Sequence, residues 1–184
     1  MKEYFESIQR CVDDHNYHAA MFLALSIPDI CGGLQYPEIK SKGERARKWF
    51  AENMKEKYFP DNLKEHFLAT FPQYIASMSS SDLEALKTQQ PGVQLTPQIF
   101  WHLRNAFLHE ASDQANSVKI HITHSTSNLC LINDAIQISA MVFPKDMSLA
   151  GLQWLERMKD DGKVWSLIIS RAKIKNDISS GLFL

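Results

Sequence analysis

The sequence predicts a mainly helical, single-domain protein that carries a small antiparallel β-meander. Apolar residues recur every three to four positions through most of residues 1–112, the pattern of amphipathic helices. From residue 118 apolar and polar residues alternate instead, the pattern of a half-buried strand. Helical spacing returns after Pro144. We therefore expect a helical bundle over 1–112, the meander over 113–143, and a helix with a tail over 144–184.

Length and composition limit the number of domains, the possible partners and the expected compartment. The chain has 184 residues, 45% of them hydrophobic, which is enough for one domain with a core. The formal net charge of −1 gives no overall attraction to nucleic acid, so an RNA contact must rest on a local patch. Three widely spaced cysteines indicate free thiols in a reducing compartment. The N-terminus lacks a signal-peptide profile, and we expect no bilayer-spanning run, so the expected location is the cytoplasm.

The first two helices are expected over residues 3–14 and from 16 to about 30. The second has few polar residues and should be the central core helix. Pro28 should kink or shorten it, and the pair Gly32 and Gly33 should end it. A third helix should cover 41–58.

A basic run crosses the start of that third helix. It is the best candidate for contacts with a phosphate backbone. The same pattern is also typical of a solvated helix face. The candidate substrate-binding residues of the run are Lys40, Lys42, Arg45, Arg47 and Lys48.

The middle of the chain is expected to form short helices. One begins at Pro60-Asp61 with apolar residues at helical spacing, and Pro72 bends or divides it. Ser81 and Glu84 have the spacing of a capping box for a helix over 82–89.

The next expected helix contains the candidate catalytic residues. Thr96 is expected to be its N-cap and Pro97 its first residue, and it should run to about Ala111. One apolar stripe along this helix is expected to face the core. A second, narrower apolar strip contains Trp101 and Leu108, so the helix needs partners on two sides. The residues of the core stripe are Ile99, Phe100, Leu103, Ala106, Phe107 and Ala111.

Polar residues form a patch on the same helix. His102, Asn105 and His109 are neighbours on its surface. Arg104 and His109 point about 140° apart around a helix of 3.6 residues per turn. The two side chains of one helix should therefore be poorly placed to act together on one small group. A second copy, packed through the strip of Trp101 and Leu108 across a two-fold axis, would bring two such sets into one cleft.

Arg104, Asn105 and His109 give the spacing Arg-Asn-x-x-x-His. This motif resembles the signature of the HEPN superfamily, the higher-eukaryote and prokaryote nucleotide-binding domains. The resemblance covers about residues 15–112, and the later segment looks similar to small HEPN-like proteins of plasmids and other mobile DNA. Many members of the superfamily are metal-independent endoribonucleases of toxin and defence systems with a site at a dimer interface. The resemblance implies a HEPN-like bundle, no cofactor or metal, a homodimer, an RNA or nucleotide ligand, and an antitoxin protein as a further partner.

The same residue types suit phosphoryl transfer in RNA. Imidazole changes its charge near neutral pH, so His109 would exchange a proton with the ribose 2′-OH or the leaving 5′-oxygen. Arg104 would hold the phosphate, Asn105 would orient His109 or bind the phosphate, and His102 would contact the substrate. Asp29, the one acid in its apolar helix, either lies in water or pairs with a cation, and Arg104 is the first partner to test.

Other interpretations stay open. An arginine and a histidine in one amphipathic helix also occur as a structural pair, so the second functional hypothesis is a non-catalytic HEPN-like module that binds a nucleotide, RNA or a protein. His121, His124 and Cys130 are weak candidates for a metal site, because strand residues three apart point to opposite faces.

The last third of the chain is less regular. The meander should pair a strand near 118–123 with strands over 129–132 and 135–142, joined by a tight turn at Asn133-Asp134. A helix should then run from Pro144 to about Asp161, with Gly162 as its stop. Residues 163–175 fit neither helix nor strand well, and we expect the tail from Asn176 to be mobile or ordered by a partner.

Overall fold

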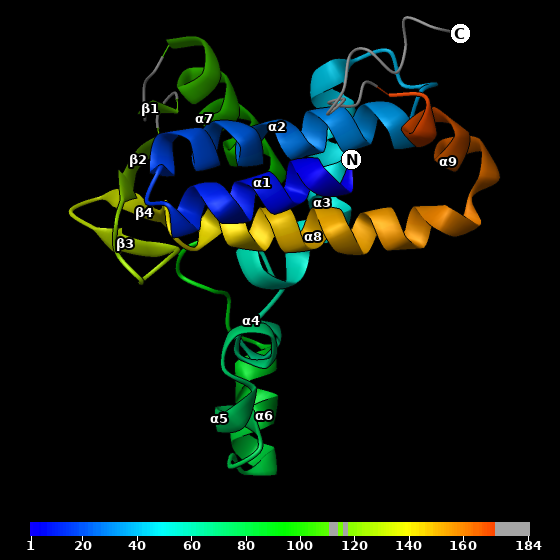
Figure 1. Cartoon of the computed structure of the whole chain (residues 1–184). Helices are drawn as coiled ribbons and strands as arrows, with labels where there is room; N and C mark the ends of the chain where they lie inside the picture. The colour runs from blue at the N-terminus through cyan, green and yellow to red at the C-terminus, as the bar shows by residue number, and fades with distance from the viewer. Residues whose placement is uncertain (111–113, 116–117, 172–184) are drawn as a thin grey trace, which may run out of the picture.

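A computed structural model describes residues 1–110, 114–115 and 118–171. Helices dominate it, as expected. The body is built on three helices that lie side by side, α1 (Lys2–Asp13), α2 (Tyr17–Gln35) and α8 (Phe143–Arg157), with α3 (Lys42–Tyr58) packed against α2 and α8 (Figure 1). The motif helix α7 (Pro97–Glu110) contacts α2 and α3. Together these helices enclose one hydrophobic core.

Helix α2 is the central core helix, but it is longer than expected. It begins after Asn16, whose side chain accepts a hydrogen bond from the Ala19 N–H, and continues through Pro28, Gly32 and Gly33 to Gln35. The prediction that the two glycines end the helix is wrong. Gly32 instead lies where α2 approaches the backbone of α3, a contact that only a residue without a side chain permits.

Among the described residues, α2 also has the length and apolar composition that a membrane crossing needs. The expectation that no apolar run is long enough to span a bilayer is therefore wrong by those two measures. Five other helices contact α2 within the described residues, namely α1, α3, α7, α8 and α9 (Gly162–Ile169). Half of its apolar window is buried against these neighbours.

Three short helices project away from the body in Figure 1: α4 (Leu63–Thr70), α5 (Pro72–Ile75) and α6 (Ser80–Lys87). Pro72 begins α5 and so divides this region, as predicted. The capping residue of α6 differs from the prediction. Ser79, rather than Ser81, accepts the hydrogen bond from the Asp82 N–H, so the helix starts two residues earlier.

A small mixed sheet follows α7. Its strands are β1 (Gln114–Ala115), β2 (Val118–Thr123), β3 (Cys130–Ile132) and β4 (Ala135–Ser139), in the order β1-β2-β4-β3. β4 pairs with β3 as an antiparallel hairpin but runs parallel to β2. The predicted antiparallel meander is therefore wrong in topology. The hairpin turn is as predicted, since Asn133 and Asp134 both have positive φ, as a two-residue type I′ turn requires.

β4 is one of the two inner strands of the sheet, and every one of its residues is buried. A strand covered on both faces needs a neighbour at each edge, whereas a meander would have left it outermost. It also ends at Ser139 rather than continuing to residue 142.

The helix that follows the sheet, α8, is part of the body. α8 packs on α1, and the Ser148 hydroxyl donates a hydrogen bond to the Phe5 carbonyl at 2.8 Å. A short 3-10 turn, η1 (Met158–Asp160), connects α8 to α9 (Gly162–Ile169). Gly162 therefore begins a helix rather than ending one, and Asp161 caps it. Ala111 and the tail from Asn176 lie outside the described residues.

Candidate functional site

The motif helix begins as its sequence predicts. The Thr96 hydroxyl accepts a hydrogen bond from the Ile99 N–H at 3.3 Å, and Pro97 is the first helical residue. The predicted core stripe faces inward, with Phe100 and Leu103 fully buried and Ala106 and Phe107 nearly so. This packing fixes the rotation of α7 and so decides where its polar residues point.

Arg104 is the centre of the site. One terminal nitrogen, Nη2, donates to Asp29 Oδ2 at 2.7 Å, and the two side chains are 14% and 23% exposed. The other, Nη1, donates to Asn105 Oδ1 at 3.0 Å and lies 3.0 Å from His109 Nε2. The predicted ion pair between Asp29 and Arg104 is thus present, and it joins the middle of α2 to α7.

Arg104 and His109 meet inside one chain. The expectation that a single helix would hold them too far apart is therefore wrong. The helical angle describes where side chains leave the backbone, not where they end. Arginine is long enough to lie along the helix surface, so its guanidinium reaches the imidazole one turn further on.

The contact also fixes a proton position. A guanidinium can only donate hydrogen bonds, so Nε2 of His109 must present a lone pair to Arg104 and the ring proton belongs on Nδ1. His109 is exposed, whereas Asp29 and Arg104 are mostly covered. The arrangement is an exposed imidazole that contacts a guanidinium, which a partly buried carboxylate orients in turn.

Trp101 covers the other side of Arg104. The guanidinium carbon lies 5.1 Å from the centre of the Trp101 ring, a cation–π distance. The same ring packs on Gly43 of α3, where a Cβ atom would lie 2.8 Å from it. Leu108 packs on the core as well. The strip of Trp101 and Leu108, which we expected to meet a second copy, is therefore used at least in part within the chain. An aromatic residue three positions before an arginine was the sequence signal for this stacking.

The basic run on α3 lies partly beside the site. Gly43 touches Trp101, and the Arg45 side chain lies against Gly33, one turn along α2 from Asp29. Arg45 and Arg104 each have a buried Nε without a hydrogen-bond partner among the described residues. Lys48 lies over the Tyr36 ring at 4.0 Å. The exposed members are Lys40, Lys42 and Lys48, and the half-buried ones are Arg45 and Arg47.

His102 stays on the motif helix but outside the group around Arg104. Its Nε2 lies 2.8 Å from Gln98 Nε2, one turn back, and the side chain is half-buried. It lies two turns before His109 on nearly the same helix face.

A hollow of about 740 Å³ lies between α3 and α8, away from the group around Arg104. Several of its polar side chains already have partners within the protein. Lys57 donates to Asp146 at 2.7 Å, Tyr36 donates to Glu52, and Arg157 donates to Asn53. Burial raises the pKa of Tyr36, and its bond to the Glu52 carboxylate raises it further, so the phenol stays a proton donor at neutral pH. We interpret this hollow as a polar seam between two helices.

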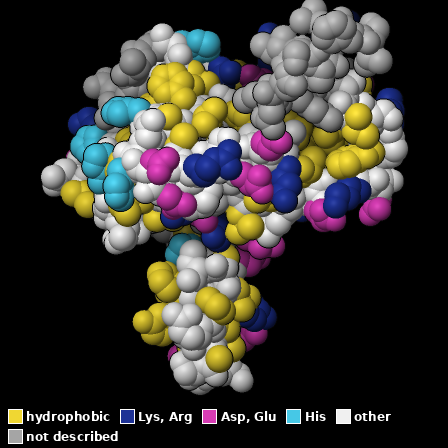
Figure 2. Space-filling view, viewed as in Figure 1, with side chains coloured by type: hydrophobic (Ala, Val, Ile, Leu, Met, Phe, Trp, Pro, Cys, Tyr) yellow, Lys and Arg dark blue, Asp and Glu magenta, His cyan; other side chains and the backbone are white. Residues whose placement is uncertain are grey.

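The three weak metal candidates are not brought together. His121 contacts Gln137 and His124 packs on Tyr17, while Cys130 lies on β3. Within the described part of the chain, no group of three or more His, Cys, Asp or Glu side chains has the arrangement of a metal site. The cyan side chains in Figure 2 show that several histidines share one side of the molecule.

Comparison with models of known protein families, with curated protein sequences and with solved structures finds no match to this chain. The resemblance to HEPN proteins therefore rests on the motif of α7 and its helical setting.

The ion pair at the site gives a direct prediction for stability. Asp29→Ala should lower the free energy of unfolding by about 1–3 kcal/mol, because Arg104 would lose a short charge-assisted hydrogen bond in a mostly covered position. Urea denaturation followed by circular dichroism measures this. Glu6→Ala is the control, since it removes an exposed pair with Lys2 at 3.4 Å and should change stability by less than about 0.5 kcal/mol. Equal effects of the two variants would contradict the proposed importance of the Asp29 pair.

Proposed function

We propose that the chain is a HEPN-like endoribonuclease that cleaves RNA without a metal ion, in a toxin or mobile-element defence system. The observation that carries the proposal is the contact between Arg104 and His109, with Asp29 behind Arg104. A phosphate-binding cation and a neutral base at hydrogen-bond distance are what cleavage by the neighbouring 2′-OH needs.

The reaction would proceed as follows. A phosphate oxygen of the RNA accepts a hydrogen bond from Arg104 Nη1, which frees the lone pair on His109 Nε2. That nitrogen takes the proton of the 2′-OH while the 2′-oxygen attacks phosphorus. The bond from phosphorus to the 5′-oxygen breaks, and a general acid protonates the leaving oxygen. The products are a 2′,3′-cyclic phosphate and a 5′-hydroxyl.

A second histidine would serve as that acid. In the two-chain form of the proposal, a second copy contacts the first through the exposed edge of α7 and contributes its own His109. The exposed lysines of the basic run, Lys40, Lys42 and Lys48, would bind backbone phosphates, because the net charge of the whole chain supplies no attraction.

The test is cleavage of single-stranded RNA by the purified chain in EDTA, with a DNA strand of the same sequence as the second substrate. We expect RNA to be cut to cyclic-phosphate ends and DNA to stay intact, since DNA lacks the 2′-OH. Arg104→Ala should lower the rate by about 10²–10³-fold, as expected for loss of one group that stabilises charge in the transition state. Arg10→Ala, an exposed cation on α1, is the matched control and should leave the rate unchanged. Cleavage of DNA, or full activity of Arg104→Ala, would contradict the mechanism.

The second candidate is a non-catalytic HEPN-like module that binds a nucleotide, RNA or a protein. The favouring observation is that Arg104 already has Asp29, Asn105, His109 and Trp101 around it, the surroundings of a structural side chain as well as of a catalytic one. RNA binding without cleavage in the same experiment would select this function.

A further inference from the structure

Phe22 is an exposed aromatic residue on α2, the central core helix. Its neighbours Met21 and Leu25 are buried, whereas Phe22 is 43% exposed. The Phe22 ring packs on Phe107 of α7, with 5.1 Å between the ring centres and 57° between the ring planes. Phe107 is only 8% exposed. A buried ring therefore supports Phe22, and part of the Phe22 side chain stays accessible to solvent.

The Phe22 ring lies in line with the group around Arg104. At 3.6 residues per turn, Asp29 and Gly33 point within about 20° of the direction of Phe22 on α2. Asp29 holds Arg104 by the ion pair at 2.7 Å. The Arg45 side chain lies 4.0 Å from the position that a Cβ of Gly33 would take. An exposed ring and two cations therefore follow one another along the same face of α2.

The spacing between the ring and the guanidinium of Arg104 suits one nucleotide. Phe22 and Asp29 are seven residues apart, about 10 Å along α2. Their partners on α7, Phe107 and Arg104, are three residues apart, about 5 Å along that helix. A single nucleotide, which has its base at one end and its phosphate at the other, can span a separation of this size.

We propose that Phe22 stacks on an RNA base next to the phosphate that Arg104 holds. Every base offers a flat face to an aromatic ring, and such stacking is how many proteins hold single-stranded nucleic acid. The bases of a duplex are already stacked on each other and are not available to a side chain. The cations favour RNA over an apolar protein segment, because a phosphate would complement Arg45, whose buried Nε has no partner among the described residues.

Phe22 would position the RNA rather than take part in the reaction. Stacking acts on the bound and the reacting RNA alike, so it lowers KM and leaves kcat unchanged. The inference rests on the proposed function, because the stacked base belongs to the RNA that Arg104 and His109 would cut. It adds the substrate class, which is RNA with an unpaired base next to the cut.

Binding of an uncleavable strand tests the inference. The probe is a short labelled single-stranded RNA with methylated 2′-hydroxyls, which cannot attack the phosphate, and its duplex is the second probe. We expect Phe22→Ala to raise the dissociation constant for the strand by about 5–100-fold, the effect of losing one stacked base. The dissociation constant for the duplex should stay the same. Fluorescence anisotropy measures both. With a cleavable strand, Phe22→Ala should raise KM by a similar factor and keep kcat.

Two conservative variants separate stacking from simple apolar contact. Phe22→Trp keeps a flat ring and should bind the strand at least as tightly as the parent chain. Phe22→Leu keeps an apolar side chain against Phe107 but has no flat ring, so it should lose affinity as Phe22→Ala does. A Phe22→Leu chain with the full affinity of the parent would mean that no base stacks there.

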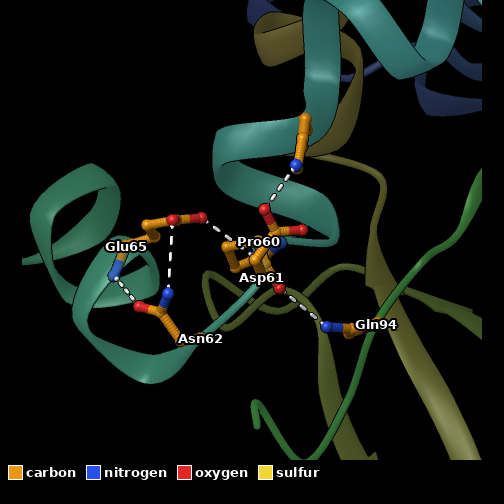
Figure 3. Close-up of polar contacts among 6 residues, drawn as sticks. Pro60, Asp61, Asn62, Glu65 and Gln94 are labelled. Atoms are coloured by element: carbon orange, nitrogen blue, oxygen red, sulfur yellow. Dashed lines mark hydrogen bonds and ion pairs between the residues drawn. The ribbon is translucent and has the colours of Figure 1, made fainter. Parts of the chain in front are cut away.

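Tyr74 is the matched control, because it is an exposed aromatic residue away from the site. It is 55% exposed on α5, and its ring centre lies 5.9 Å from that of Phe71. Helices α4, α5 and α6 project from the body on the side away from α7 (Figure 1). A hydrogen bond of 2.8 Å from the Gln94 amide to the Pro60 carbonyl fastens the start of this projection (Figure 3). Tyr74→Ala should leave the affinity for strand and duplex unchanged.

The outcomes distinguish this inference from the nuclease proposal. A parent chain that binds the strand through Phe22 but cuts no RNA would contradict only the nuclease. RNA cleavage with a KM that Phe22→Ala does not change would contradict only the stacking. A parent chain that binds no RNA, an equal loss of strand and duplex binding in Phe22→Ala, or the same loss in Tyr74→Ala would also overturn the inference.

Discussion

His109→Ala is expected to lower metal-free RNA cleavage by about 10²–10⁴-fold, the contribution that a positioned general acid or base makes. His109 is the exposed partner of Arg104, so its removal would leave in place the cation that we propose binds the phosphate and would take away the proposed base. Initial rates on a labelled RNA in EDTA measure the loss. The control is His18→Ala, an exposed histidine on α2, which should keep the full rate. A His109→Ala chain that cuts RNA at the parent rate would remove His109 from the mechanism.

Mixing two inactive variants tests which chain supplies each group. Because Arg104 and His109 are in contact within one chain, a mixture of Arg104→Ala and His109→Ala chains should stay inactive. If the two groups instead work across a dimer, mixed dimers would contain one complete site and the mixture would recover activity. Recovery would therefore show that the contact within the chain is not the working arrangement.

Gly32→Ala should lower the free energy of unfolding by about 2 kcal/mol. A Cβ at this position would lie 2.5 Å from the Arg45 carbonyl oxygen and 2.8 Å from its carbon, so α2 and α3 would have to separate. Overpacking of this kind costs about 1–3 kcal/mol, occasionally more, and at so short a distance to rigid backbone it exceeds the gain of about 1 kcal/mol that alanine brings to a helix.

The neighbouring glycine is the matched control. At Gly33 a Cβ would meet only the end of the Arg45 side chain, at 4.0 Å, so Gly33→Ala should stabilise the chain by about 0.5–1 kcal/mol. Urea denaturation of both variants measures the two opposite signs. A Gly32→Ala chain as stable as the parent would mean that α2 and α3 do not approach so closely.

Local signals in the sequence predicted much of the site. Thr96 and Pro97 marked the start of α7. The lone carboxylate of Asp29 in an apolar helix left two alternatives, water or a cation, and Arg104, the first partner to test, is the one that the structure shows. The roles of Arg104, Asn105 and His109 in cleavage stay predictions. The contact between Arg104 and His109 was missed because an angle around the helix axis says nothing about the reach of a long side chain.

Long-range pairing explains most of the differences in the fold. Alternating residues predicted the strands, but strand order depends on which neighbours cover β4, whose residues 135–139 are buried on both faces. Gly32 and Gly33 have the composition of a helix end, yet Gly32 serves a close approach to α3, which lies later in the chain. In the segment of α4 and α5, Phe67, Phe71 and Tyr74 have helical spacing but do not cover a core. The hydrophobic core lies in the body of the molecule instead.

The contact between α1 and α8 has a consequence for synthesis. Phe5 of α1 is fully buried, and its carbonyl accepts the bond from Ser148, more than 140 residues later. A nascent chain that has left the ribosome only as far as the sheet would still expose the apolar face of α1 to solvent. Productive collapse should therefore wait until residue 157 has emerged, and chaperones that hold unfinished chains would have their longest access during that interval.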